Sequence, residues 1–156
     1  MSNLMFRLIV RYFSRWFHTD KFADFFPVSV KGLLLDQGKV LLLKNEREEW
    51  DFPGGKILEH GQVKATLVRE FLEETNLNIE IRELMAADLY TVVESKVFVT
   101  IFQVSLMDSN ALRISKEHMA YNFFSLEEVD KIKTAQWVPQ VIEEFKKTRT
   151  TINEIY

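Results

Sequence analysis

Two neighbouring stretches, PGGK at residues 53–56 and REFLEE at residues 69–74, decide how this chain is interpreted. The first places paired glycines after a short β-like run, and glycine lets the backbone adopt positive φ and approach a ligand closely. In the second, helical spacing brings Glu70 onto the same face as the two glutamates three and four residues further on. Three neighbouring like charges are unfavourable without a cation, so the pattern favours a hard divalent metal.

A helix over residues 62–76 is expected to carry these glutamates. Its apolar positions predict a buried face on the other side, with these residues at its centre and margin: Ala65, Val68 and Leu72, then Leu67 and Phe71. Three helical glutamates alone would favour a solvated acidic face instead. The glycine turn and Lys56 immediately upstream change that interpretation, because a metal beside backbone amides and a cation suits phosphate chemistry.

The run from Gly55 to Leu77 resembles the Nudix box, G-x5-E-x7-R-E-U-x-E-E-x-G-U, in which U is apolar. Seven of its nine specified positions agree in register: Gly55, Arg69, Glu70, Phe71, Glu73, Glu74 and Leu77. Residues 50–54, WDFPG, are also similar to the family's usual lead-in. The resemblance extends over about residues 27–147 and implies a Nudix-type α/β/α sandwich around a central mixed β-sheet.

Two positions depart from the box. Asn76 replaces its late glycine, and this change is mild because asparagine tolerates the left-handed conformation that ends a helix. Gly61 replaces the first glutamate, which matters more. Glu59 and Gln62 are the residues that could take over the missing role. The family's first glutamate is secondary to the last pair, so we expect activity to survive with altered metal occupancy.

The resemblance implies a metal site and a phosphate cleft. The expected ligands of Mg²⁺, with Mn²⁺ as a substitute, are Glu70, Glu73 and Glu74. The residues expected to line the substrate cleft through backbone groups are Gly54, Gly55 and Lys56. Arg69 either contacts phosphate or braces a metal-binding glutamate, and the family pattern favours bracing.

Hydrolysis also needs a base to deprotonate the attacking water. The resemblance implies that a glutamate on a loop after the long strands can serve, and Glu117 occupies that place. His118 is a weaker candidate, and Glu73 or Glu74 is an alternative. Together with Arg69, these glutamates form the expected catalytic set.

The expected function is that of a Mg²⁺-dependent pyrophosphohydrolase. Its substrate would be a nucleoside diphosphate derivative: a nucleoside triphosphate, ADP-ribose or a nucleotide sugar. The alternative is a non-catalytic Nudix-like module that senses a nucleotide, which the loss of an acid at Gly61 motivates. Four aromatics could stack on a base, although core packing is favoured for each: Tyr90, Phe98, Phe124 and Trp137.

The composition sets the limits of these expectations. The chain has 156 residues, of which 47% are hydrophobic and 28% charged, which is typical of one compact globular domain. A net charge of -3 argues against a stable nucleic-acid partner. The absence of cysteine excludes disulfides and fits a cytoplasmic location.

Residues 1–26 are expected to form an amphipathic helical arm ahead of a Nudix domain at residues 27–156. Basic and polar side chains fall on one narrow arc of this arm, while aromatic and aliphatic ones fill much of the rest. The favoured interpretation is packing on the chain's own domain or on a twin subunit as a homodimer. A peripheral contact with an anionic membrane and a targeting role are alternatives.

The rest of the chain alternates strand and helix signals. The expected strands are residues 28–35 and 39–44 as a hairpin, 79–93 with a break, 96–106 and 120–125. Helices are expected over residues 126–131 and 137–147, the first opened by a capping box of Ser125 and Glu128.

Overall fold

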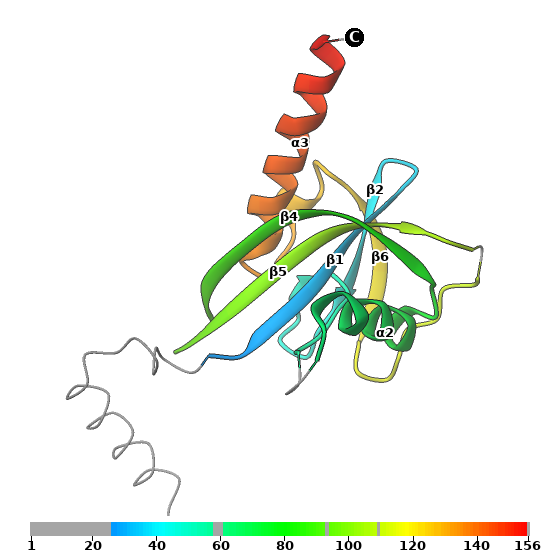
Figure 1. Ribbon diagram of the computed structural model, residues 1–156, viewed down its shortest axis with the longest axis vertical. Helices are drawn as coiled ribbons and strands as arrows, with labels where there is room; N and C mark the ends of the chain where they lie inside the picture. The colour runs from blue at the N-terminus through cyan, green and yellow to red at the C-terminus, as the bar shows by residue number, and fades with distance from the viewer. Residues whose placement is uncertain (1–25, 58–60, 93, 109, 156) are drawn as a thin grey trace, which may run out of the picture.

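The structure is a computed structural model that describes residues 26–57, 61–92, 94–108 and 110–155 (Figure 1). The expected N-terminal helix therefore lies outside the described residues. The elements in chain order are β1 (Val28–Asp36), β2 (Lys39–Lys44), β3 (Trp50–Asp51), α2 (Val63–Thr75), β4 (Ile79–Val92), β5 (Ser95–Leu106), β6 (Ala120–Ser125), the 3-10 helix η2 (Val129–Lys131) and α3 (Trp137–Ile155). Within these ranges no helix is both long and apolar enough to cross a membrane.

The strands form one mixed sheet. Its order is β3-β2-β1-β5-β4, and β6 pairs with β2 off this path. The β1–β5 pair is parallel, whereas the other strand pairs are antiparallel. The expected mixed α/β fold with a central mixed sheet is confirmed.

The hairpin that joins β1 to β2 turns at Gln37 and Gly38. Both residues have positive φ, 48° and 80°, as a two-residue type I′ turn requires. The turn pairs Leu35 with Val40 and sets the register of the two strands. The hairpin expected from the sequence is therefore present.

Each face of the sheet packs against its own helix. On one face, α3 contributes Val138 and Ile142 to a buried cluster with β-strand residues such as Leu33 and Ile101. On the other face, Leu67 and Phe71 of α2 form a second cluster. The far end of α3 projects beyond the sheet (Figure 1) and reaches Ile155, well past the expected end at residue 147.

Helix α2 begins and ends where the sequence indicates, but it presents a different face to the sheet. Asn76 ends it in the left-handed conformation, with φ 61°, and its backbone N–H donates to the Leu72 carbonyl oxygen at 2.8 Å. Leu67 and Phe71 are buried as expected. The burial expected for three others is wrong: Ala65 is exposed, and Val68 and Leu72 are 38% and 41% exposed.

The segment after β6 also differs from expectation, because only Val129–Lys131 is helical. Half of the capping box forms: the Ser125 backbone N–H donates to the Glu128 carboxylate at 2.8 Å, and this bond lowers the pKa of Glu128. The helix stops because the next residues pair with another strand. The Trp50 N–H donates to the Lys133 carbonyl oxygen, and the Ala135 N–H donates to that of Trp50.

Candidate active site

The glycine turn lies directly beside β1. The Gly32 and Val30 N–H groups donate to the carbonyl oxygens of Pro53 and Gly55, each at 2.9 Å. Gly54 has φ 130°, and a Cβ there would lie 2.2 Å from the Val30 carbonyl oxygen. Only glycine fits this position, so the close approach of the turn to the sheet depends on it.

Two glutamates of α2 meet this turn. The Gly54 N–H donates to Oε2 of Glu74 at 2.7 Å. The Glu70 carboxylate lies so close to Gly55 that a Cβ on Gly55 would be 2.6 Å from Glu70 Cδ. Gly55 therefore makes room for the Glu70 carboxylate, while Gly54 lets the turn approach β1 and offers its N–H to Glu74.

Glu74 is the most enclosed acid of the site, with 7% of its surface exposed. Its Oε2 accepts the Gly54 N–H, and its Oε1 lies 2.8 Å from His118 Nε2. The contact with Gly54 requires α2 to turn its Glu74 edge inward, which is the physical reason that Val68 and Leu72 turn outward. A buried carboxylate held by two partners is pre-oriented rather than solvated.

Arg69 lies between the other two glutamates. Its guanidinium donates to Glu70 at 2.5 Å and to Glu73 at 2.7 Å. The hydrogen bond with Glu70, and then the charge of Glu70, raise the pKa of Arg69 above its ordinary value. These contacts are the arrangement that bracing requires, and the catalytic role of Arg69 stays a prediction.

The three glutamates consequently do not converge on one point. Glu73 is an exposed residue that pairs with Arg69, while Glu74 faces the turn. Across the described part of the chain, no three His, Cys, Asp or Glu side chains are grouped closely enough to hold a metal ion. Oxygen donors at the glycine turn nevertheless fit a hard divalent cation, since the carboxylates of Glu70 and Glu74 both reach the turn.

A second set of contacts holds the turn from the opposite side. Lys31 of β1 donates to the Gly54 carbonyl oxygen and forms an ion pair with Asp51 Oδ2, both at 2.9 Å. Asp51 Oδ1 accepts the indole N–H of Trp137 at 2.7 Å and the Phe52 N–H at 2.8 Å. Lys31 and Asp51 were not among the residues predicted for the site. The available signal was a lysine within a mostly apolar strand, because a buried lysine requires a partner.

A cleft of about 210 Å³ opens beside these contacts. The residues that line it are Lys31, Asn45, Glu46, Arg47, Asp51, Phe52, Glu117 and His118. Of the two candidate bases that line the cleft, His118 contacts Glu74, while Glu117 is exposed and its carboxylate makes no hydrogen bond or ion pair with the described residues. The cleft thus places Glu117 on the side of the site where His118 meets Glu74.

The remaining candidates lie around the margin. Lys56 and Gly61 are exposed. Gln62 forms the N-cap of α2 without a side-chain cap bond, and Glu59 lies outside the described residues. The aromatic candidates are not among the residues that line the cleft: Trp137 and Phe124 are buried in the core, and Tyr90 and Phe98 are half-buried.

Comparison with known proteins matches this arrangement of turn, helix and sheet. A family model described as NUDIX domain matches residues 25–145. The chain belongs to the Nudix family. The family and the hydrolase class expected from the box are therefore confirmed.

Two solved structures share this fold, and one of them is named as a pyrophosphatase. A MutT protein from Methanosarcina mazei superposes with a TM-score of 0.71 at 24% identity, covering 80% of this chain and 95% of that one. An ADP-ribose pyrophosphatase from Streptococcus suis gives 0.64 at 20% identity, covering 79% and 92%. At these identities the likeness establishes the fold.

A curated relative resembles a shorter part of this Nudix chain. Nucleoside diphosphate-linked moiety X motif 6 from Xenopus laevis is 39% identical over 64 residues. The match covers 38% of this chain and 30% of the length of that relative.

Proposed function

We propose that this Nudix protein is a Mg²⁺-dependent pyrophosphohydrolase that cleaves the diphosphate of a nucleoside diphosphate derivative. One observation carries the proposal: Glu74 is buried, yet its carboxylate is held at a glycine turn by the Gly54 N–H and by His118. Burying a carboxylate is costly, so an acid at a buried position of α2 needs a reason beyond apolar packing. A functional requirement for charge at the turn accounts for it.

The residues that would hold the metal are Glu70, Glu73 and Glu74. When bound, the cation would neutralise diphosphate charge and polarise a phosphorus centre. Arg69 would hold Glu70 and Glu73 in place through the hydrogen bonds that it donates to both carboxylates. The backbone of Gly54, Gly55 and Lys56 would border the phosphate chain.

Glu117 is our preferred base. It lines the cleft, and its carboxylate makes no hydrogen bond or ion pair with the described residues, so it would be placed to take a proton from a water molecule. His118 instead orients Glu74. Since the cleft of about 210 Å³ is small for a whole nucleotide, it would enclose only one part of the substrate.

Nucleoside triphosphates, ADP-ribose and nucleotide sugars are the proposed substrates. The name of one similar solved structure, an ADP-ribose pyrophosphatase, supports the second. We keep the cytoplasm as the proposed location because the chain lacks cysteine. A second copy of the chain or an anionic membrane remains an alternative proposed partner for residues 1–26.

The test is a hydrolysis panel with identified products. The protein is incubated with Mg²⁺ and each substrate class, with and without a chelator, and phosphate-containing products are separated and assigned. We expect one class to yield a nucleoside monophosphate in a metal-dependent manner. Binding seen by calorimetry without any turnover would instead support the nucleotide sensor.

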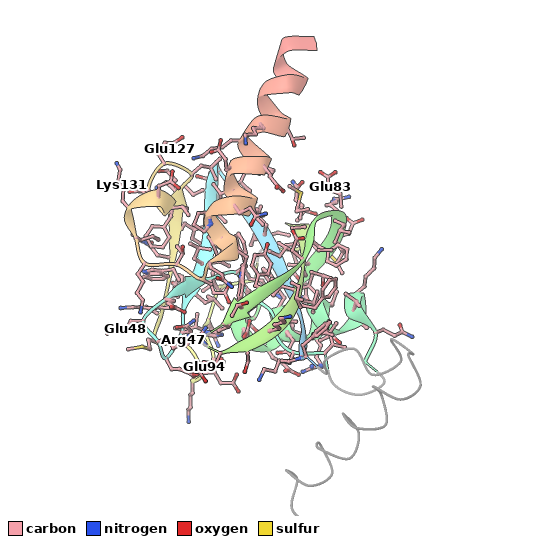
Figure 2. All side chains as sticks on the ribbon, turned by 90° about the vertical axis from the view of Figure 1, so that its left-hand side faces the viewer. Arg47, Glu48, Glu83, Glu94, Glu127 and Lys131 are labelled. Atoms are coloured by element: carbon pink, nitrogen blue, oxygen red, sulfur yellow. The ribbon has the colours of Figure 1, made fainter. Side chains whose placement is uncertain are left out.

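Glu74→Gln and Glu127→Gln form the matched pair for this panel. Both remove one negative charge and keep the side-chain shape. Figure 2 shows Glu127 at the end of the molecule away from the loop with Arg47 and Glu48, which carries part of the cleft. Turnover should collapse for Glu74→Gln and persist for Glu127→Gln. Equal turnover in the two variants would refute the proposed site.

A further inference from the structure

Exposed apolar side chains are concentrated on one side of the sheet. In the described residues, the exposed large hydrophobics include Leu84 at 54% and Leu89 at 45%, both on β4. Helix α2 adds Val68 and Leu72. Scattered exposed apolar residues are ordinary, but a contiguous group indicates a surface that something covers.

The strand register shows that these residues share a face. Phe102 packs against the α2-side core, and Phe98 lies on the same face because side chains alternate along β5. Leu84 pairs with Phe102 and Leu89 pairs with Phe98 in the antiparallel β4–β5 ladder. Directly opposed residues point to the same side, so Leu84 and Leu89 face the α2 side.

The exposed flank of α2 borders this area. Glu70 and Glu74 point toward the glycine turn, which lies along the edge of β1 that is not paired with β5. Val68 and Leu72 lie on the other flank of the helix, at helical angles well away from the two acids. They therefore face β5 and β4. We call the combined area the α2-side patch: Val28, Val68, Leu72, Leu84, Leu89 and Phe98.

The chain itself leads into this patch. Val28 pairs with Phe98 in the parallel β1–β5 ladder, and the ring of Phe26 lies 6.5 Å from that of Phe98. Residues 1–25 are thus tethered at the patch margin. Tethering gives them a high effective concentration there, which a separate molecule lacks.

The composition and length of residues 1–25 suit such a cover. Between Leu4 and Phe17, and not counting these two, the segment has eight large aliphatic and aromatic residues: Met5, Phe6, Leu8, Ile9, Val10, Tyr12, Phe13 and Trp16. The patch spans three strands, about 10 Å across at a strand spacing of about 4.8 Å. A segment of this length can cross it even if fully helical, at about 1.5 Å per residue.

We propose that residues 1–25 fold back and cover the α2-side patch of their own chain. The segment would bury its apolar residues against Val68, Leu72, Leu84 and Leu89 and leave its arginines at the surface. This contact would close the side of the sheet that α2 leaves open. The proposal is independent of the proposed catalytic function.

The test uses the full chain, which has no cysteine and so accepts a single nitroxide label. The label is attached to Thr91→Cys, because Thr91 is exposed and follows Leu89 on the patch side of β4. Amide signals of the ¹⁵N-labelled chain are compared before and after reduction of the nitroxide. We expect signals from Leu4 to Phe17 to lose more than half their intensity.

The matched control is a label at Asn122→Cys. Asn122 is exposed and pairs with Leu42, which belongs to the α3-side core, so this label lies on the other face. Signals from residues 4–17 should keep their intensity there. Leu84→Ser together with Leu89→Ser should reduce the loss seen with the Thr91→Cys label, and neither exposed change threatens the fold.

Two further experiments test whether a second copy of the chain or a membrane is the partner instead. Spin-labelled chain without ¹⁵N is mixed with unlabelled ¹⁵N chain, and broadening in that mixture would assign the patch to a second copy. Flotation with vesicles of phosphatidylcholine and phosphatidylglycerol would assign the segment to a membrane if the protein floats and its signals are unbroadened. Either result, or no broadening of residues 4–17 in any sample, overturns the proposal.

Discussion

The two flanks of helix α2 differ in exposure, and in the direction opposite to their polarity. On the flank that meets the glycine turn, the acid Glu74 is 7% exposed and has two partners. On the other flank, the aliphatic Leu72 is 41% exposed. Hydrophobicity alone predicts the reverse, because transfer from water favours burying leucine and opposes burying a carboxylate.

The difference teaches that a few directed polar contacts set the rotation of this helix. The Gly54 N–H is fixed by a turn that is itself bonded to β1, so Glu74 must come to it. Rotating α2 to bury Leu72 would break that bond and leave a buried donor unsatisfied, which costs about 1–3 kcal/mol. Leu72 is left for another cover, as inferred above.

The largest effect is expected from removing charge on the acidic flank. Glu74→Gln should lower kcat by about 10²–10³, the range found when one preorganised stabilising group is lost from an active site. Leu72→Ser on the other flank should leave kcat within about twofold, since Leu72 lies on the side of the helix away from the glycine turn. Steady-state kinetics on the substrate identified by the panel measure both. Comparable losses would show that the two flanks do not differ in function.

Next in size is the effect of crowding the turn that fixes the acidic flank. Gly54→Ala should destabilise the fold by about 3 kcal/mol or more, because φ 130° and a Cβ 2.2 Å from a carbonyl oxygen both oppose a side chain. Gly38→Ala is the control: it also has positive φ, but its Cβ would meet nothing within 4 Å. That variant should cost about 1 kcal/mol. Urea unfolding measures the loss of unfolding free energy in both variants. Equal losses would contradict the close approach of Gly54 to β1.

A smaller effect is expected when the turn loses its support from the sheet. Lys31→Met keeps most of the volume but removes the ion pair with Asp51 and the hydrogen bond to the Gly54 carbonyl oxygen. We expect a loss of about 2 kcal/mol, because Asp51 keeps two donors while one carbonyl oxygen loses its partner. Lys39→Met, at an exposed strand end, is the control and should change stability by under about 0.5 kcal/mol.

The sequence predicted what depends on local rules. The Gln37-Gly38 turn, the left-handed Asn76 and the boundaries of α2 follow from backbone preferences that neighbours hardly alter. The glycine turn and the glutamates were also found, because their spacing is itself the motif. The sequence did not reveal which distant residues lie close together in space. The rotation of α2 cannot be deduced without knowing that Glu74 lies beside Gly54, nor the second contact without knowing that Lys31 lies beside Asp51.

The same limit explains the short η2 helix. Ser125 and Glu128 carry a valid start signal, and part of the predicted box forms. The helix still ends at Lys131, because the backbone at Lys133 and Ala135 bonds to Trp50, some eighty residues earlier in the chain. Local propensity was overruled by a long-range pairing that no window of sequence contains.

The smallest effect is expected from Tyr90→Phe on the α3 side of the sheet. This change tests whether that side excludes water, in contrast to the exposed apolar residues on the α2 side. The Tyr90 hydroxyl is buried there, and within the described residues it has no hydrogen-bond partner. Its ring contacts Trp137 edge to face. Tyr90→Phe should therefore keep the packing and raise stability near neutral pH by at most about 1 kcal/mol, because an unsatisfied buried group disappears.

The Tyr90→Phe change should also alter how stability falls at alkaline pH. Burial, followed by the charges of Asp88 and Glu144, raises the pKa of Tyr90, so the folded state holds the phenol proton more tightly than the unfolded chain. Stability from this group is complete below the unfolded pKa of about 10 and is lost as pH rises through the folded value. Thermal unfolding of Tyr90→Phe should show a shallower alkaline decline than that of the parent. If the variant and the parent decline alike, water reaches the Tyr90 hydroxyl, and the α3 side is more open than its core suggests.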